Sequence, residues 1–233
     1  MAVIEPKNAR LRIERFDYRI VFAKEGRAIY ISHLDMMRAF QRIIKRAKLP
    51  VWHTQGFNPH VYIMFPLALS LGMESRCEVM DIALIEKLAC DEVKQRLNAS
   101  MPEGFEVISV GEPVNKHTDI AFSCYEARIA SDKTPEETKE MFEGFLSRET
   151  IEIEKRTKKK TTKLVDIKPY IECEGIEAGD DCVTVRLRLP SGTGFNLNLN
   201  VVIDAFAELS GTAVETLCAR RTNILMENGE NFT

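Results

Sequence analysis

The chain has 233 residues, of which 45% are hydrophobic and 29% are charged, and its formal net charge is −3. This length suits one large domain or two smaller ones, and this composition excludes extensive disorder. No stretch approaches the ~20 apolar residues of a membrane helix and the N-terminal segment has no apolar core, so we expect a cytoplasmic protein without membrane contact. The six cysteines are scattered without a CxxC pair, which favours reduced thiols over a disulfide framework or an iron–sulfur cluster.

Hydrophobic periodicity and turn residues divide the chain into two halves with the same order of elements. The first half is predicted to contain a strand at 18–23, a helix from about 32 to 48, strands at 61–65 and 76–85, a helix at 88–99 and a strand at 105–110. The second half is predicted to contain a strand at 121–130, a helix at 135–146, strands at 150–155, 164–173 and 182–189, a helix ending near 209 and a strand at 218–226.

This repeated order is the βαββαβ signature of ferredoxin-like folds. We therefore expect an α+β fold of two tandem ferredoxin-like domains, in which antiparallel sheets carry helices on one face. The expected bounds are 1–16 for an N-terminal extension, 17–112 for the first domain and 119–228 for the second.

The first predicted helix has a capped start and two distinct faces. Ser32 supplies an N-cap hydroxyl, and Asp35 follows at the capping-box spacing with Asp in place of Glu. A basic ridge at i, i+4, i+7 spacing is formed by Arg38, Arg42 and Lys45. The apolar stripe is predicted to be Leu34, Met37, Phe40, Ile44 and Ala47.

Positive charge is concentrated in two segments that the overall net charge conceals. Lys and Arg outnumber the acids by eight to two between Arg19 and His60, and by seven to one between Lys155 and Lys168. The second segment is predicted to be a basic β-hairpin at 155–168 that projects from the sheet. A hairpin that is merely solvated and one that follows a phosphate backbone fit this pattern about equally well. In the second case its RNA-binding residues are Arg156, Lys158, Lys159 and Lys160.

A polar loop at 54–60, Thr-Gln-Gly-Phe-Asn-Pro-His, follows the first helix. It offers hydrogen-bonding groups beside an aromatic face, while Gly56 permits a backbone conformation that other residues resist. Recognition of single-stranded or looped RNA requires basic side chains that contact phosphates and aromatic rings that stack on unpaired nucleobases. The residues predicted to bind RNA in this half are Lys24, Arg38, Arg42, Lys45, Gln55, Phe57, Asn58 and His60. The alternative is a capped amphipathic helix with a solvated basic face and a tight loop.

Two histidines raise an enzymatic alternative. His33 and His60 near a bound phosphodiester would serve as general base and general acid in metal-independent RNA cleavage. Against this, His33 lies in the first turn of a helix and His60 precedes a strand, where each can have a local structural role. The histidines lack a recognisable metal-ligand motif, so we expect no metal, and we expect no cofactor.

These segments together resemble a known family. They are Lys24-x-Gly26, then Ile31-Ser32-His33-Leu34-Asp35 with Arg38, then Gly56-Phe57-Asn58-Pro59-His60, then Pro66 to Gly72, Glu78 and Asp81. The string is similar to the radical-SAM-linked family, a domain of unknown function found alone or fused behind B12-type radical SAM proteins. Within the motifs we assign structural roles to Gly26, Ser32, Asp35, Gly56 and Pro59.

The resemblance implies a bacterial protein connected with RNA metabolism. The chain has no radical SAM cysteine motif, so it is similar to the stand-alone form, and radical chemistry would belong to a partner. We therefore expect an RNA-binding accessory module in rRNA or tRNA processing or modification that works with a radical SAM enzyme and has no catalytic activity of its own. The alternatives are the endoribonuclease that uses His33 and His60, and a protein-interaction module of a radical SAM enzyme.

Overall fold

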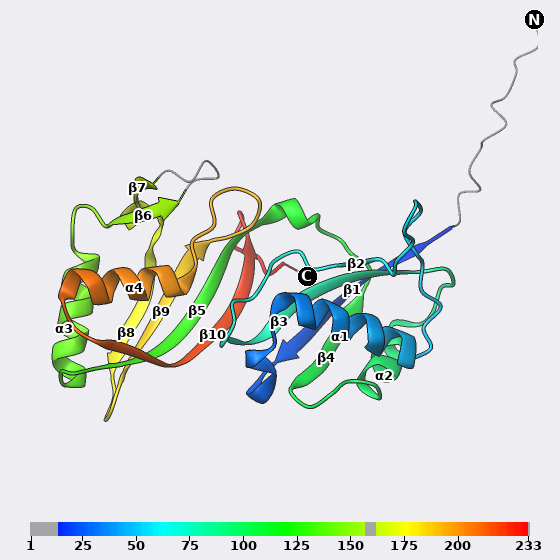
Figure 1. Ribbon diagram of the computed structural model, residues 1–233, viewed down its shortest axis with the longest axis horizontal. Coiled ribbons are helices and arrows are strands. Elements are labelled where there is room, and N and C mark those ends of the chain that lie inside the picture. Colours follow the sequence, from blue (N-terminus) through cyan, green and yellow to red (C-terminus); the bar gives the residue numbers. More distant parts are fainter. Residues whose placement is uncertain (1–13, 157–161, 233) are drawn as a thin grey trace, which may run out of the picture.

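The computed structural model describes residues 14–156 and 162–232, which form an α+β protein built on one mixed eight-stranded sheet (Figure 1). The strands of this sheet are β1 (Phe16–Lys24), β2 (Ile63–Met64), β3 (Glu74–Leu84), β4 (Phe105–Gly111), β5 (Ile120–Ser131), β8 (Glu172–Ala178), β9 (Val183–Pro190) and β10 (Val214–Met226). The α-helices of the described residues are α1 (His33–Arg46), α2 (Cys90–Asn98), α3 (Pro135–Leu146) and α4 (Leu199–Ser210). In these ranges, none of the helices is long and apolar enough to cross a lipid bilayer.

The two halves of the chain share the sheet. Its order is β4-β1-β3-β10-β5-β9-β8, with β2 also paired to β3. Neighbouring strands within each half are antiparallel, whereas β3 and β10 join the halves as a parallel pair, with Arg220 opposite Glu74 and Arg221 opposite Ser75. The expected α+β class is confirmed, but the expected two antiparallel sheets are one continuous mixed sheet.

The length of β2 explains why the sheet continues across the halves. This strand has two residues and pairs with Asp81 and Ile82 alone, so the beginning of β3 keeps an open edge. An unpaired edge leaves backbone donors and acceptors free to bond another strand, and β10 pairs there. A full-length β2 would have occupied this edge.

The first half has a core between its strands and the helices α1 and α2. Tyr18, Ile20 and Phe22 point from β1 into this core, as their alternation predicts. Phe22 and Phe40 of α1 pack with their ring centroids 4.9 Å apart. The buried residues of α1 are Met36, Phe40, Ile43 and Ile44, a stripe displaced from the predicted one.

The second half has its own core under α3 and α4. Thr134 caps α3 by accepting from the Glu137 amide, while the Glu137 carboxylate accepts from the Thr134 amide. Phe142 of α3 and Phe206 of α4 meet with their ring centroids 4.8 Å apart, over the apolar faces of β5 and β9.

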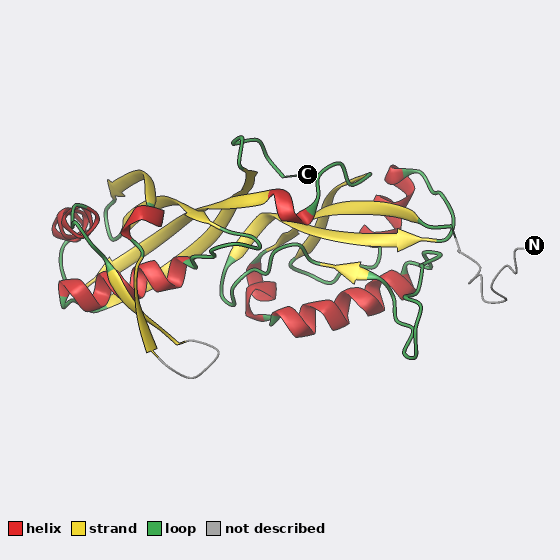
Figure 2. Cartoon of the chain, turned by 90° about the horizontal axis from the view of Figure 1, so that it is seen from above, coloured by secondary structure: helices red, strands yellow, loops and turns green. Residues whose placement is uncertain are grey.

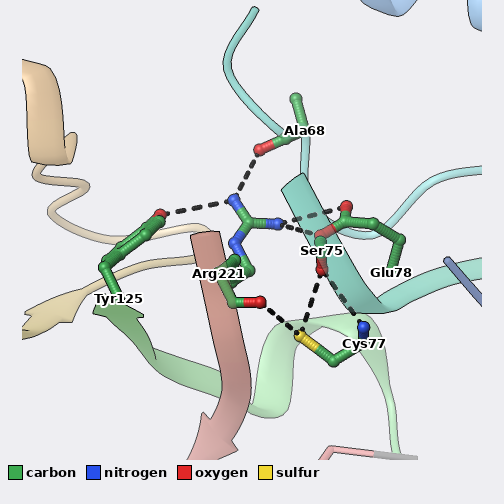
Figure 3. A network of polar contacts seen from close by, with 6 residues as sticks. All are labelled: Ala68, Ser75, Cys77, Glu78, Tyr125 and Arg221. Atoms are coloured by element: carbon green, nitrogen blue, oxygen red, sulfur yellow. Dashed lines mark hydrogen bonds and ion pairs between the residues drawn. The ribbon is translucent and has the colours of Figure 1, made fainter. Parts of the chain in front are cut away.

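A buried ion pair lies where the two halves meet (Figure 3). Arg221 of β10 donates through Nη1 to both carboxylate oxygens of Glu78 on β3, at 2.9 and 3.2 Å, and both side chains are at most 3% exposed. Its Nη2 donates to the Ala68 carbonyl at 2.8 Å and to the Tyr125 hydroxyl at 3.3 Å. The guanidinium therefore connects β10 with β3, with β5 and with the segment before β3.

We predict that Arg221→Met lowers the free energy of unfolding by about 3–5 kcal/mol, because it leaves the Glu78 carboxylate buried without its bidentate partner. The double variant Arg221→Met with Glu78→Leu should recover only part of this loss, because the Lys24 amine then stays buried without the nearby Glu78 carboxylate. Urea denaturation followed by circular dichroism measures both. Arg186→Met breaks ion pairs that are more than one third exposed and should cost no more than about 1 kcal/mol. A loss at Arg221 no larger than this control would show that the pair does not hold the halves together.

Candidate nucleic-acid interface

Helix α1 presents its basic ridge to solvent. The predicted cap is confirmed: Ser32 Oγ accepts from the Asp35 amide at 3.2 Å and donates to the Asp35 carboxylate at 2.8 Å. Asp35 also accepts from Arg38 Nη1 at 3.0 Å. Arg42 and Lys45 are exposed and make no ion pair with any described residue, so their charges are available to a ligand.

The loop at 54–60 is the closed end of a narrow hairpin. Its base is a bridge between His53 and Val61, and the Thr54 amide donates to the His60 carbonyl at 2.8 Å. The His60 amide donates to Thr54 Oγ1 at 3.2 Å, and His60 Nδ1 lies 3.0 Å from the same oxygen. His60 thus helps to close the loop while its ring stays exposed.

The tip of this loop exposes the groups that were predicted to contact RNA. Phe57 is fully exposed, and Gln55 and Asn58 lie beside it in solvent. Gly56 has a φ of 154°, a conformation that residues with a side chain rarely adopt. The Phe57 ring therefore contributes nothing to the core and is accessible to a ligand.

Trp52 supports the base of the hairpin. Its ring packs edge-on against Tyr62 at 6.0 Å between centroids, and the Arg15 guanidinium lies 5.2 Å from the Trp52 ring and 5.1 Å from the Tyr62 ring. These contacts fix the direction in which the loop leaves the sheet.

Lys24, which was predicted to bind RNA, does not lie on this surface. It is 2% exposed, and its Nζ donates to the carbonyls of Ile31 at 3.0 Å and Ile29 at 3.4 Å. Burial lowers the pKa of the Lys24 amine, and the nearby Glu78 carboxylate partly offsets this effect. The side chain therefore holds the turn that leads into α1, and Gly26 starts that turn with a φ of 55°.

His33 and His60 have separate local contacts. The His33 ring packs edge-on against Phe65 at 5.5 Å, and its Nδ1 is buried without a partner among residues 14–156 and 162–232. His60 Nδ1 lies 3.0 Å from Thr54 Oγ1 and 3.1 Å from the Asn58 carbonyl. Each histidine thus has local structural contacts, and no hydrogen bond joins the two among the described residues.

The basic hairpin of the second half stands apart from the main sheet. Strands β6 (Glu152–Arg156) and β7 (Thr162–Asp166) form a separate two-stranded sheet, so the predicted hairpin begins earlier in the chain than residue 155 and is not a pair of strands of the main sheet. The predicted residues Lys158, Lys159 and Lys160 lie outside the described residues, as does the side chain of Arg156.

The hairpin and the loop project from the body in the same direction, near opposite ends of the molecule (Figure 2). Along the long axis of the molecule helix α1 lies between them, and in Figure 1 it lies below both.

One exposed feature was not predicted from the sequence. Tyr30, Leu34 and Leu71 are between 60% and 74% exposed. The Gly72 amide donates to the Ile29 carbonyl at 2.9 Å, which brings the segment containing Leu71 beside the turn before α1. The sequence pattern of α1 could have predicted the exposure of Leu34, because Met36, Phe40 and Ile43 form a stripe at helical spacing that does not include it.

The family model described as "Uncharacterized protein conserved in bacteria (DUF2344)" matches residues 17–198. The chain belongs to this family. No curated protein matches the DUF2344 chain. Two solved structures are similar to it at 14% identity: a chain of the crystal structure of a Cbf5-Nop10-Gar1 complex, with a TM-score of 0.47, and the crystal structure of an unknown protein from Galdieria sulphuraria, with a TM-score of 0.27.

The first match covers 89% of the DUF2344 chain and 48% of the other chain, so the DUF2344 chain spans about half of that protein. The second covers 87% and 98%. At these TM-scores neither likeness supports an inference about function. Inferences about function therefore rest on the surface described above.

We predict that Asp35→Asn flattens the pH dependence of stability in acid. Hydrogen bonds from Ser32 and then Arg38 lower the pKa of Asp35 below its usual 3.8, so the folded state binds this proton less readily than the unfolded state. The resulting stability is present above about pH 4 and is lost as pH falls through the lower folded pKa. Thermal unfolding between pH 5 and about pH 2 should therefore show wild type and variant converging in acid. Glu140→Gln, exposed on α3, is the control substitution.

Proposed function

We propose that the DUF2344 chain binds single-stranded or looped RNA and serves as a non-catalytic accessory module in rRNA or tRNA processing or modification. The observation that carries this proposal is the fully exposed Phe57 at the tip of a closed, polar loop that follows the basic ridge of α1. Phe57 would stack on an unpaired base, and the neighbouring amides of Gln55 and Asn58 would read base edges. Arg38, Arg42 and Lys45 would neutralise phosphates.

We propose that residues 17–112 and 119–228 are two ferredoxin-like units that share a sheet. The orders β4-β1-β3-β2 and β10-β5-β9-β8 correspond strand for strand, and β6 with β7 is an insertion in the second unit. Each unit then contributes one projecting element to the RNA-binding surface.

A protein partner is the second candidate function, and the exposed apolar patch of Tyr30, Leu34 and Leu71 favours it. An exposed group of large apolar side chains is typical of a protein contact. We propose a radical SAM enzyme as this partner, on the resemblance of the sequence motifs. Co-purification that survives nuclease and high salt, and that Leu34→Asp with Leu71→Asp abolishes, would support it. Unchanged co-purification of that variant would count against the patch.

We predict that the DUF2344 chain binds a mixed RNA pool in a strongly salt-dependent way, measured by filter binding. Arg38→Ala with Arg42→Ala should weaken binding and reduce the salt slope, because each phosphate contact to a single strand contributes about −0.7 to that slope. Phe57→Ala should cost about 1–3 kcal/mol of binding free energy, the range for one stacked base.

The matched control is Lys133→Ala with Lys139→Ala, which removes the same charge near the start of α3, in the second half. Equal weakening by the control would mean that binding follows net charge alone. An absence of salt-sensitive binding to any RNA would remove the proposal.

We predict that labelled RNA stays intact when incubated with the wild-type chain in the presence of a chelator. His60→Ala should reduce affinity, because His60 closes the recognition loop, while His33→Ala should leave affinity unchanged. Gel electrophoresis of the RNA detects cleavage. Cleavage that disappears in both His33→Ala and His60→Ala would instead establish the endoribonuclease.

A further inference from the structure

A groove of about 820 Å³ lies between the β6–β7 hairpin and helix α4. Four consecutive positions of β6 line one wall, from Glu152 to Lys155, and α4 forms the opposite wall. Figure 1 places β6 between β7 and α4, in agreement with this lining. The groove is separate from α1 and from the 54–60 loop, which belong to the other half of the chain.

The wall formed by β6 is an open strand edge. Among the described residues β6 pairs with β7 alone. The Ile151 carbonyl accepts from the Ile167 amide, and backbone groups alternate in direction along an antiparallel strand. The backbone N–H and C=O of Glu152 and Glu154 therefore point away from β7, toward α4. Such an edge can accept a further strand.

The floor of the groove is apolar and partly uncovered. Ile153, Phe195 and Val201 form this floor, and all three are partly exposed. Leu164 pairs with Glu154, so its side chain shares a face with Glu154 and lies on the other face of the hairpin from Ile153. Phe195 is held in place by the stacked ring of Tyr170, 4.3 Å away, and by Lys155 Nζ, 5.0 Å from its centroid. This floor matches the alternate apolar side chains of an added strand.

The rim of the groove is acidic. Glu152 and Glu154 line it from β6, and Asp204 and Glu208 line it from α4, all four exposed. The lining also contains the cations Lys155 and Arg148, so four carboxylates against two cations leave a net charge of −2 on the described residues of the lining. A net negative charge favours Lys and Arg over RNA phosphates.

We propose that this groove binds an extended, basic segment of a partner protein, which adds to the edge of β6 as a third strand. Backbone hydrogen bonds to Glu152 and Glu154 would provide affinity, and alternate apolar side chains would cover Ile153 and Phe195. The intervening Lys or Arg side chains would lie on the face of Glu152 and Glu154. The groove is thus a second binding surface with a charge preference opposite to that of α1.

The test uses the full chain and a fluorescein-labelled seven-residue peptide of alternating Lys and Val, with fluorescence anisotropy as readout. Glu152→Lys with Glu154→Lys should weaken binding at least tenfold, about 1.4 kcal/mol, because it reverses the charge that faces the Lys side chains of the peptide. Glu154→Pro should do the same, since Pro removes an outward N–H and is tolerated on a strand edge. A peptide with Glu in place of Lys should not bind.

The control variant is Glu136→Gln with Glu140→Gln on α3, which removes two acids outside the groove and should leave binding within about twofold of wild type. Unchanged melting temperature and RNA affinity show that each variant is folded. Binding that is insensitive to the double Glu-to-Lys variant and to Glu154→Pro overturns the proposal, as does an equal effect of the control. A dimer that Glu154→Pro converts to a monomer, seen by sedimentation, also overturns it and assigns the groove to a second copy of the chain.

Discussion

The buried carboxylate of Glu78 connects the two halves of the molecule with the start of helix α1. It accepts both hydrogen bonds from Arg221 Nη1, and this anchors β10 on the open edge of β3. It also supports the charge of Lys24, whose amine holds the carbonyls before α1. Two buried cations thus depend on one anion, and each would be costly to bury without it. The direction of α1 and the junction of the sheet are therefore stabilised together.

This connection gives the motifs of the first half a physical meaning. Lys24, Gly26, Gly72 and Glu78 are motif residues of the first half, and the structure places all four in or beside this framework. Gly72 donates to the Ile29 carbonyl, one of the two that Lys24 also contacts. The framework is buried around Lys24 and Glu78, while Phe57 is fully exposed in its loop. Motif residues therefore divide into those that hold the surface and those that form it.

Much of the fold could be predicted because its signals are local. The start of α1 at Ser32 and of α3 after Thr134 follow from cap residues, and the core strands follow from alternation. The joining of the sheets could not be predicted, because it depends on how short β2 is and on two pairs of residues far apart in the sequence. Lys24 was misplaced for a related reason. A lysine is normally exposed, and its burial depends on carbonyls and a carboxylate that come together only in the folded chain.

The same reasoning separates the two surfaces of the molecule. The sequence showed a basic segment around the hairpin, and a basic hairpin alone would point to RNA. The structure adds that the strand leading into it borders an apolar groove whose four exposed carboxylates converge from β6 and α4. The residues of that rim are fifty positions apart in the chain, so composition along the sequence cannot reveal it. The groove and helix α1 lie in different halves and differ in charge, so the two proposed ligands, a basic protein segment and a nucleic acid, would be selected by surfaces of opposite sign.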